Sequence, residues 1–361
     1  MKNIFGKAML LATALLFSIT GTSCSSDDSP VPEKEKTYDM SGFAKGADVS
    51  WLTEMEQDGV KFYNQNGKAE ECMWLLRDLG TNAIRLRVWV NPEGGWCGKD
   101  DVIAKASRAQ ALGYRLMIDF HYSDTWADPG NQKVPAAWQN YTFEQMKQAV
   151  ADHTKDVLSA LKERGVTNVE WVQVGNETRD GMLFSSDEAV TGKASKNAAN
   201  FAAYVNAGYE AVKEVYPQAK VVVHVDEGNN LGRYTWLFGE LKKKGGKWDV
   251  IGMSLYPEDN NWQDLTTNCL NNIKTLSEQY NCNVIVSEIG MWWGSDQAAP
   301  MMKKMVDGCK AITTCEGIFY WEPEVYNNWK PANYSTLGWD AYTKGAFDTS
   351  GKPTAVFDAY K

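Results

Sequence analysis

The chain alternates short apolar runs with longer helical patterns about eight times, and this alternation restricts its fold more than any other feature. Short apolar runs bounded by turn residues are typical of buried parallel strands, and the segments between them supply the crossover helices. With 361 residues, the chain is predicted to form a single α/β domain, a closed (β/α)8 barrel of the TIM type. The predicted strands are residues 46–50, 82–90, 115–121, 168–175, 220–225, 250–255, 284–287 and 317–321, and the predicted helices are residues 69–79, 101–112, 142–164, 196–216, 234–244, 265–280, 298–312 and 354–360.

Polar and aromatic residues stand at the end of every predicted strand. In a barrel of this kind the chemistry lies at the carboxyl ends of the strands, where the strand–helix loops meet. The opposite ends carry ordinary turn sequences such as GTNA and GYRL. The sequence therefore predicts a functional site at one end of the barrel. The residues at the strand ends are Asp48, Ser50, Arg85, Arg87, His121, Tyr122, Asn176, Glu177, His224, Asp226, Tyr256, Glu288, Trp321 and Glu322.

Two of these residues are glutamates that close apolar runs. Glu177 lies in VEWVQVGNET, residues 169–178, and Glu288 lies in NVIVSEIGMWWG, residues 283–294. Taken alone, each could be an ordinary charged residue that opens a loop. Together they form the pair of carboxyl groups that hydrolysis of a glycosidic bond requires, one to protonate the leaving oxygen and one to attack the sugar carbon.

Composition excludes some partners and favours others. The net charge of −9 argues against binding of nucleic acid or of an anionic membrane surface. The chain has fifteen tryptophans and sixteen tyrosines. Most aromatic residues pack in cores, but aromatic faces also stack on sugar rings, so this content slightly favours a carbohydrate ligand.

The N-terminus is predicted to be a targeting segment. Lys2 and Lys7 precede an apolar stretch at residues 8–19 that is too short for a stable membrane anchor, and Cys24 follows small residues. This arrangement resembles a bacterial lipoprotein signal, and the acidic residues after Cys24 resemble the surface-export signal of Bacteroidetes lipoproteins. We therefore expect a signal peptide at residues 1–23, lipidation of Cys24, a disordered polar tether at residues 24–40, and a catalytic domain at residues 41–361. The expected location is the outer face of the outer membrane, with a periplasmic or secreted protein as the alternative.

Six further cysteines permit disulfides in an exported chain, but their pairing stays open. Cys269 with Cys282 and Cys309 with Cys315 are the pairs closest in sequence. The chain has three histidines and no cysteine–histidine cluster with the spacing of a metal site, so no metal or other cofactor is expected.

Several motifs resemble glycoside hydrolase family 53 of clan A. The resemblance runs in register across all the predicted strands, over about residues 43–361. It implies a (β/α)8 barrel and retaining hydrolysis of β-1,4-galactan, the side chain of type I arabinogalactan in pectin, by an arabinogalactan endo-β-1,4-galactanase. Galactan and galactooligosaccharides are then the expected partners of a monomeric enzyme. The motifs are GADVSW at residues 46–51, NAIRLRVWVNP at 82–92, IDFHYSDTWADPGNQ at 118–132, VQVGNET at 172–178, SLYP at 254–257 and SEIGMWWG at 287–294.

The resemblance assigns roles at the cleavage point. It implies that Glu177 is the general acid/base and that Glu288 is the nucleophile. Asn176, just before the acid, is placed to bond the sugar 2-hydroxyl. Arg85 is expected to hold the nucleophile ionised, with Arg87 as the alternative because the two share strand parity.

Further residues are expected to orient the nucleophile or contact sugar. Tyr256 is expected to form a hydrogen bond with the nucleophile. The alternative is a tyrosine that only lines the wall of the site. His121 is expected to bond substrate or the tyrosine, and a histidine satisfied within the barrel is equally compatible with the sequence. Asp48 is expected to bond sugar hydroxyls, although an Asx turn fits as well.

Aromatic residues are expected to form the sugar platforms. Trp321 is the expected floor beneath the sugar that is cleaved, and Trp126 with Asp124 is expected on the glycone side. Trp292 and Trp293 are expected to line further subsites, with core packing or loop anchoring as the alternative.

The sequence departs from some bacterial members after Gly294, where SDQAAP leads almost directly into the next helix. Those members carry a longer loop there that holds calcium, so no structural calcium is expected in this chain. Two other functions stay open from the sequence. One is another clan A activity, such as a β-mannanase or a xylanase, and the other is a surface glycan-binding lipoprotein without turnover.

Overall fold

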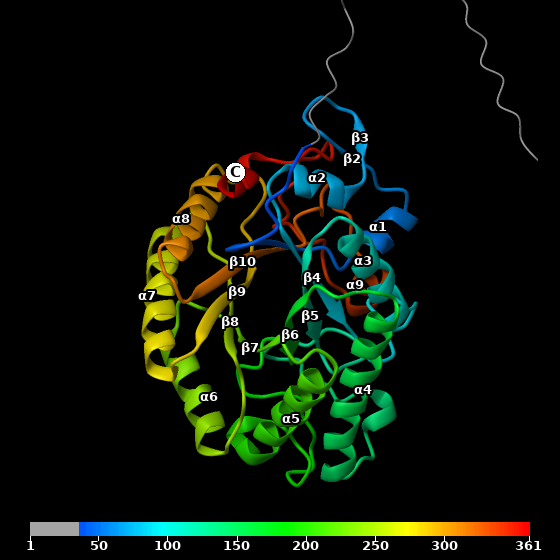
Figure 1. The fold of residues 1–361 in the computed structure, drawn as a ribbon, viewed down its shortest axis with the longest axis vertical. Helices are drawn as coiled ribbons and strands as arrows, with labels where there is room; N and C mark the ends of the chain where they lie inside the picture. Colours follow the sequence, from blue (N-terminus) through cyan, green and yellow to red (C-terminus); the bar gives the residue numbers. More distant parts are fainter. Residues whose placement is uncertain (1–35) are drawn as a thin grey trace, which may run out of the picture. The chain divides into compact units, whose positions relative to one another are not determined.

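This computed structural model describes residues 36–361, which form a closed barrel of eight parallel strands with helices outside it (Figure 1). The order around the barrel is β1-β10-β9-β8-β7-β6-β5-β4, and β1 closes the ring because it pairs with both β4 and β10. The predicted (β/α)8 fold is thereby confirmed. The barrel strands are β1 (Ala44–Asp48), β4 (Ala83–Val88), β5 (Arg115–Phe120), β6 (Val169–Val174), β7 (Lys220–Val225), β8 (Val250–Leu255), β9 (Asn283–Ile289) and β10 (Cys315–Trp321).

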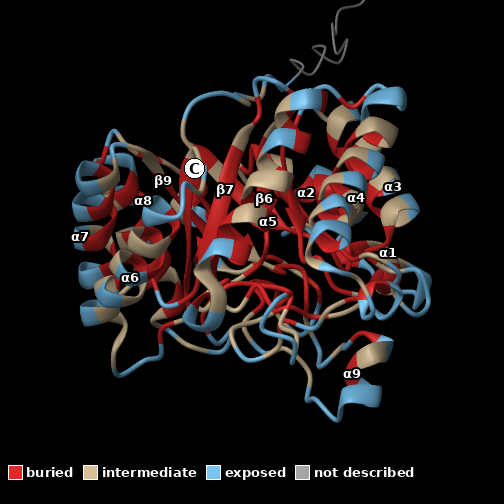
Figure 2. Cartoon of the chain, turned by 90° about the horizontal axis from the view of Figure 1, so that it is seen from below, coloured by how far each residue is buried: buried red, intermediate tan, exposed pale blue. Residues whose placement is uncertain are grey.

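Helices follow the strands along the chain and surround the barrel. Figure 2 shows the buried strands in the middle, helices on both sides with their outer faces exposed, and α9 among the loops at one end. The helices are α1 (Leu52–Gln57), α2 (Cys72–Asp78), α3 (Lys99–Ala111), α4 (Phe143–Glu163), α5 (Ala194–Val215), α6 (Leu231–Lys243), α7 (Trp262–Tyr280), α8 (Ala298–Lys310) and α9 (Ala332–Leu337), with 3-10 helices η1 (Ala136–Trp138) and η2 (Ala355–Tyr360).

The structure differs in detail from the predicted elements at three places. The predicted helix at residues 69–79 starts later, because the Glu71 carboxylate caps α2 by accepting the Trp74 N–H at 2.7 Å. The residues before it form the small antiparallel pair β2 (Phe62–Tyr63) and β3 (Ala69–Glu70). The helix predicted at residues 354–360 is the 3-10 helix η2, and the connection after β10 contains the short helix α9, which was not predicted.

The barrel interior changes from apolar to polar along the strands. Near the amino ends, inward side chains form a separate buried cluster that includes Met117, Trp171 and Phe319. Because strand side chains alternate between the two faces, the next inward positions on β5 and β6 are Asp119 and Gln173, and both are fully buried. The barrel is thus closed below by apolar packing and carries a polar layer directly beneath its carboxyl end.

One irregularity in β9 changes the direction of a side chain at the site. Met253 of β8 pairs with Val286 of β9, but the next residue, Ser254, pairs with Glu288. The extra residue, Ser287, is a β-bulge, which shifts the inward–outward alternation by one position. Glu288 therefore shares a register position with Ser254 on the neighbouring strand.

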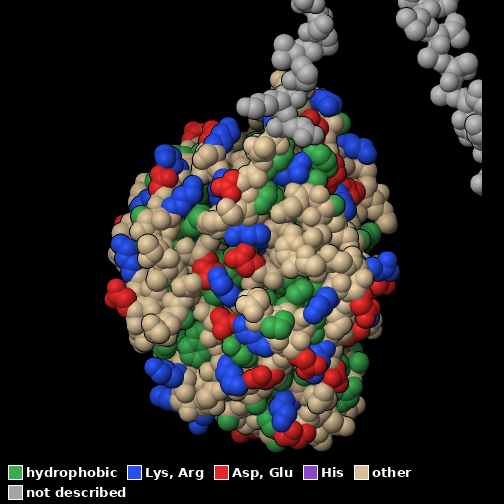
Figure 3. Space-filling model, viewed as in Figure 1, with side chains coloured by type: hydrophobic (Ala, Val, Ile, Leu, Met, Phe, Trp, Pro, Cys, Tyr) green, Lys and Arg blue, Asp and Glu red, His purple; other side chains and the backbone are tan. Residues whose placement is uncertain are grey.

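Charged side chains of both signs are interspersed over the face seen in Figure 3. Among the described residues, none of the helices is both long enough and apolar enough to span a bilayer. The predicted signal peptide, the lipidation site Cys24 and most of the predicted tether lie outside the described residues.

Candidate active site

A cavity of about 260 Å³ lies at the carboxyl end of the barrel. Both candidate glutamates line it, although more than a hundred positions separate them in the chain. The structure thereby brings together seven of the residues expected at the site: His121, Trp126, Asn176, Glu177, Tyr256, Glu288 and Trp321. The cavity wall also includes Ala127, Asp128, Trp339, Tyr342 and Lys344.

Glu177 is presented by a tight turn just beyond β6. Gly175 and Glu177 both have positive φ angles, 83° and 44°, so the chain turns sharply where the strand ends. Glu177 Oε1 accepts a hydrogen bond of 2.7 Å from the Ser254 hydroxyl. Burial, followed by the nearby charge of Glu288, raises the pKa of Glu177 well above its usual value. Its surroundings therefore favour the protonated form of Glu177.

A histidine fixes the serine that contacts Glu177. His224 Nδ1 accepts the Glu177 backbone N–H at 3.4 Å and lies 3.0 Å from both the Gln173 amide nitrogen and Asn176 Oδ1. Because Nδ1 accepts a backbone N–H, the hydrogen of the neutral ring is assigned to Nε2, which then donates to Ser254 Oγ at 2.7 Å. Burial lowers the pKa of His224 well below its usual value, which keeps the ring neutral. The Ser254 hydroxyl is then directed at Glu177.

Glu288 has the partners of an ionised carboxylate. Its Oε1 lies 2.9 Å from an Arg85 guanidinium nitrogen, and its Oε2 accepts the Tyr256 hydroxyl at 2.7 Å. Burial raises the pKa of Glu288 above its usual value. The Arg85 charge and the Tyr256 hydrogen bond act in the opposite direction, because both stabilise the ionised carboxylate. Among the described residues no cation forms an ion pair with Glu177, and this difference favours an acid at Glu177 and an anion at Glu288.

Arg85, rather than Arg87, contacts the candidate nucleophile. Arg85 is fully buried and also binds Asp48 at 2.6 Å and Asp119 at 2.9 Å. Burial alone lowers the pKa of Arg85, but the surrounding carboxylates raise it above its usual value, so the side chain is a fixed cation. Arg87 instead binds Glu322 at 3.0 Å.

Asn176 is held by both ends of its amide. Its Oδ1 accepts bonds from Arg85 at 3.0 Å and from Gln173 at 2.9 Å, and its Nδ2 donates to the Ala127 carbonyl at 2.8 Å. An amide nitrogen has two hydrogens, so one remains to donate into the cavity. This geometry is compatible with the expected contact to a sugar hydroxyl.

His121 uses both ring nitrogens inside the protein. Its Nε2 lies 3.0 Å from Asp119, and its Nδ1 accepts the Trp89 indole N–H at 3.1 Å and the Ala127 N–H at 3.2 Å. The ring lines the cavity but has no free nitrogen for a substrate. The structure thus favours the satisfied barrel histidine, the alternative that the sequence left open.

Asp48 and Asp124 also have structural contacts in place of the expected sugar contacts. Asp48 is fully buried, accepts the Ser50 N–H in an Asx turn at 3.0 Å and binds Arg85. Asp124 accepts the backbone N–H groups of Asn91 at 3.1 Å and Ala136 at 2.8 Å, which ties two loops together. Neither residue lines the cavity.

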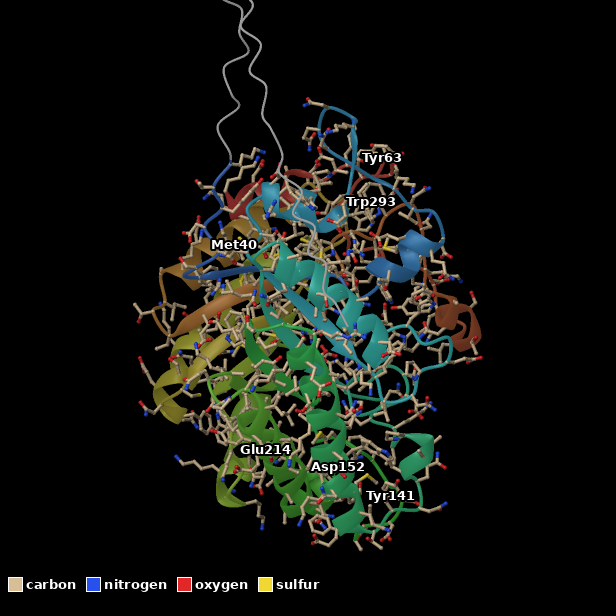
Figure 4. The ribbon with its side chains drawn as sticks, turned by 45° about the vertical axis from the view of Figure 1, so that its right-hand side comes forward. Met40, Tyr63, Tyr141, Asp152, Glu214 and Trp293 are labelled. Carbon is tan, nitrogen blue, oxygen red and sulfur yellow. The ribbon has the colours of Figure 1, made fainter. Side chains whose placement is uncertain are left out.

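Aromatic rings form much of the cavity wall. Trp321 packs edge-on against Tyr342, with ring centroids 4.6 Å apart, and the Trp126 ring lies 4.3 Å from the Arg87 guanidinium carbon. Trp292 and Trp293 are 51% and 36% exposed and do not line this cavity (Trp293 is labelled in Figure 4). Their role as further subsites stays a prediction.

Sequence reasoning missed several residues of the site. The sequence analysis did not single out Asp119 or Ser254. Asp119 lies two positions before His121, and Ser254 lies two positions before Tyr256, so each faces the same side of its strand as a strand-end residue. This spacing is the signal that could have found them. Trp339, Tyr342 and Lys344 come from the loop after β10, whose path over the barrel end no periodicity predicts.

All six cysteines within the described residues are free, so neither pair closest in sequence forms a disulfide here. The described residues also contain no group of three or more His, Cys, Asp or Glu side chains arranged to hold a metal ion.

Comparisons with known proteins agree with this fold and site. The family model described as Glycosyl hydrolase family 53 matches residues 44–300. The chain is similar to the endo-beta-1,4-galactanase of Bacillus subtilis, with 31% identity over 84% of this chain and 75% of that protein. It is also similar to the arabinogalactan endo-beta-1,4-galactanase of Thermothelomyces thermophilus, with 28% identity over 88% of this chain and 98% of that protein.

Solved structures give the same result. A fungal beta-1,4-galactanase superposes with a TM-score of 0.77 at 26% identity, covering 89% of this chain and 99% of that chain. The GH53 catalytic domain of Ignisphaera aggregans superposes with a TM-score of 0.77 at 28% identity, covering 89% and 96%. With the family model covering most of the barrel and both candidate glutamates in one cavity, the chain belongs to glycosyl hydrolase family 53 and is a glycoside hydrolase that acts on O-glycosyl bonds.

Proposed function

We propose that this enzyme is a retaining endo-β-1,4-galactanase that hydrolyses the β-1,4-galactan side chains of type I arabinogalactan. The names of its relatives support this substrate, since the proteins from Bacillus subtilis and Thermothelomyces thermophilus are both described as endo-beta-1,4-galactanases. The observation that carries the chemistry is the unequal pair of carboxyl groups in one cavity: Glu288 is bound to Arg85 and Tyr256, and Glu177 is bound to a neutral serine.

In the proposed first step, Glu288 attacks the anomeric carbon while Glu177 gives its proton to the departing glycosidic oxygen. This step forms a covalent glycosyl–enzyme ester and releases the aglycone. In the second step, Glu177, now ionised, takes a proton from water, and the resulting attack on the anomeric carbon frees Glu288. Asn176 is proposed to bond the 2-hydroxyl, and Trp321 is proposed to form the platform under the sugar.

A second cavity supports cleavage within a chain. It measures about 570 Å³ and shares Glu177 and Tyr256 with the first, and its lining also includes Pro129, Arg179 and Asp226. Because Glu177 is the proposed proton donor to the leaving group, we propose that the aglycone binds in this second cavity. Space on both sides of the cleavage point suits an endo-acting enzyme.

The proposal is tested by hydrolysis of potato galactan with wild type, Glu177→Gln and Glu288→Gln. Both variants should lose most of the activity, and the first-formed product from wild type should be the β-anomer by proton NMR. Variants as active as wild type, or an α-anomer formed first, would contradict the mechanism. Mannan and xylan belong in the same panel, since faster turnover of either would replace galactan as the substrate.

We also propose that Cys24 carries a lipid that anchors the enzyme at the outer face of the outer membrane. Its support is the sequence alone, because Cys24 lies outside the described residues. Incorporation of labelled palmitate into wild type but not into Cys24→Ala, together with protease accessibility on intact cells, tests the anchor and the side of the membrane.

We further propose that no calcium is required. The support is the short connection from the end of β9 at Ile289 to the start of α8 at Ala298. Removal of divalent ions with EDTA should leave galactan hydrolysis and the thermal midpoint unchanged, and a loss of either that added calcium restores would contradict this proposal.

A further inference from the structure

Three neighbouring strands of the barrel supply a short hydrogen-bonded chain that ends on the proposed acid. Glu177 follows β6, His224 lies on β7, and Ser254 lies on β8. His224 Nε2 lies 2.7 Å from Ser254 Oγ, and Ser254 Oγ lies 2.7 Å from Glu177 Oε1. His224 and Ser254 are both buried. The chain therefore connects a buried imidazole to one particular oxygen of the acid.

The hydrogen bonds of this chain run in one direction, from the imidazole to the carboxyl group. His224 Nδ1 accepts the Glu177 backbone N–H, so the ring hydrogen is on Nε2. Asn176 Oδ1 lies 3.0 Å from Nδ1 but needs no hydrogen from it, because other side chains already donate to both of its lone pairs. Nε2 then donates to Ser254 Oγ, and the single hydroxyl hydrogen of Ser254 is left for Glu177 Oε1.

The two oxygens of Glu177 are therefore not equivalent. A protonated carboxyl group has one O–H donor and one carbonyl oxygen, and Oε1, which accepts the serine hydrogen, takes the place of the carbonyl oxygen. Oε2 has no hydrogen-bond partner among the described residues and is not enclosed by protein atoms. Because Glu177 lines both cavities of the site, Oε2 is the oxygen available to a substrate.

The main chain of His224 supports the acid separately from the ring. Its carbonyl oxygen accepts the Thr178 backbone N–H at 2.8 Å and the Thr178 hydroxyl at 2.9 Å. These bonds hold the turn in which Glu177 has a φ angle of 44°, a conformation that is costly for a residue other than glycine. A substitution at His224 keeps the carbonyl group and both bonds, so the contribution of the ring can be tested on its own.

We propose that His224 is a positioning residue for acid catalysis: acting through Ser254, it keeps the proton of Glu177 on Oε2, the oxygen that faces the substrate. The glycosidic oxygen takes this proton as its bond to the anomeric carbon breaks, and Glu177 is left as the carboxylate. His224 and Ser254 keep their own hydrogens in this step. The inference rests on the proposed function for the role of Glu177 and adds which oxygen carries the proton and what selects it.

The test uses leaving groups that differ in their need for a proton. Phenyl galactobioside requires acid assistance, whereas 2,4-dinitrophenyl galactobioside releases a stable phenolate without it. Because a general acid contributes about 10²–10⁴-fold, His224→Leu and Ser254→Ala should each lose at least about tenfold more kcat/KM on the phenyl substrate than on the dinitrophenyl substrate. Equal losses on both substrates, as a general structural effect would give, or no loss on either, would overturn the proposal.

A double variant tests whether His224 acts through Ser254. His224→Leu combined with Ser254→Ala should show about the same preference for the dinitrophenyl substrate as Ser254→Ala alone, because the hydroxyl that the ring orients is already absent. Preferences that multiply in the double variant would mean that the two residues act independently, which contradicts the proposed chain.

His121 provides the matched control, because it is a second buried histidine at the same end of the barrel but on the side of the nucleophile. Its Nε2 lies 3.0 Å from Asp119, which binds the Arg85 guanidinium that contacts Glu288. His121→Leu should lower kcat/KM by similar factors on both substrates, since attack by the nucleophile is needed whichever group leaves. A preference like that of His224→Leu would overturn the assignment.

Glu177→Gln separates this inference from the proposed function. If Glu177→Gln shows no preference for the dinitrophenyl substrate, the acid role of Glu177 in the proposed function fails. If Glu177→Gln shows the preference and His224→Leu does not, only this inference fails. Should wild type prefer xylan or mannan, the same two leaving groups are used on xylobiose or mannobiose, so the test does not depend on the sugar.

Ring-nitrogen NMR observes the direction of the chain directly. Wild type is prepared with isotope-labelled histidine, and the signals of His224 are assigned by their absence in His224→Leu, which is practical because the chain has three histidines. The proposal predicts a hydrogen on Nε2 and none on Nδ1. A hydrogen on Nδ1 would turn the Ser254 hydroxyl towards the ring and away from Glu177, and would overturn the proposal.

Discussion

At the scale of residues, the site separates two chemically identical side chains by their partners. Glu288 contacts the buried Arg85 cation and the Tyr256 hydroxyl. Glu177 accepts a hydrogen bond from a neutral serine, and the nearby negative charge of Glu288 raises its pKa. A bell-shaped pH profile of kcat/KM follows, because Glu288 must be ionised and Glu177 protonated. The acidic limb then belongs to Glu288 and the alkaline limb to Glu177.

Tyr256→Phe is expected to move the acidic limb to higher pH. The phenol stabilises the anion of Glu288 and lowers its pKa, so its loss raises that pKa. A hydrogen bond to a charged group contributes about 1.5–3 kcal/mol, so kcat/KM should fall about 10- to 100-fold. If Tyr256→Phe kept the wild-type kcat/KM and the acidic limb did not shift, the tyrosine would only line the cavity.

Ser254→Ala is expected to move the alkaline limb of the pH profile of kcat/KM. The serine hydroxyl stabilises the ionised form of Glu177 and lowers its pKa, so the variant should keep the proton to higher pH. The alkaline limb of kcat/KM should therefore shift upward while the acidic limb stays in place. A shift of the acidic limb alone would contradict the assignment of the limbs.

At the scale of elements, strand alternation explains most of the site and fails at one position. Arg85, Asp119, Gln173 and Ser254 follow the inward parity of their strands, so a sequence pattern can find them. From Ile285, an inward residue, strict alternation would direct Glu288 outward, and only the bulge at Ser287 turns it into the cavity. The end of an apolar run made Glu288 a candidate, and the resemblance to a family assigned it the role of nucleophile.

Loops were the least predictable elements. Trp292 and Trp293 follow Glu288 closely in sequence yet lie outside the cavity, while Trp339 and Tyr342 of the loop after β10 line it. Loop paths depend on tertiary contacts such as the edge-on packing of Trp321 on Tyr342, which no local period encodes.

Gly46→Ala tests the packing of the barrel interior. A Cβ at this position of β1 would lie 2.2 Å from the Phe319 ring, which fills the barrel from β10. The overpacking should lower the free energy of unfolding by about 1–3 kcal/mol, measured by urea denaturation. Gly239→Ala on α6 is the matched control, since its Cβ meets nothing within 4 Å and helix propensity predicts about 0.5–1 kcal/mol of stabilisation. Equal effects of both substitutions would contradict the packing argument.

At the scale of the whole molecule, a buried acidic pair couples stability to pH. Glu322 and Glu324, at the start of the loop after β10, are fully buried. Burial, followed by the charge of Asp48, raises the pKa of Glu322 from 4.5 to about 7, and burial with the charge of Glu322 raises the pKa of Glu324 well above its usual value. The folded state therefore binds protons that the unfolded state releases. This stabilisation is fully present below the ordinary value of 4.5 and is lost as the pH rises through about 7.

Glu324→Gln should make stability less dependent on pH. The variant keeps a neutral side chain at every pH, so its free energy of unfolding should fall less than that of wild type between about pH 5 and about pH 8. Urea denaturation at both pH values measures this difference, with Glu163→Gln on the exposed surface of α4 as the control. The same pH dependence in wild type and Glu324→Gln would contradict the assignment.

The central claim is that Glu288 attacks the sugar while Glu177 supplies the proton, and trapping the covalent intermediate tests it most directly. Wild type is incubated with a 2-deoxy-2-fluoro galactobioside that bears an activated leaving group, and the labelled peptide is identified by mass spectrometry. The account predicts one sugar label on the peptide that contains Glu288, and no label on Glu288→Gln. A label on Glu177, or complete hydrolysis without a label on any carboxylate, would contradict it.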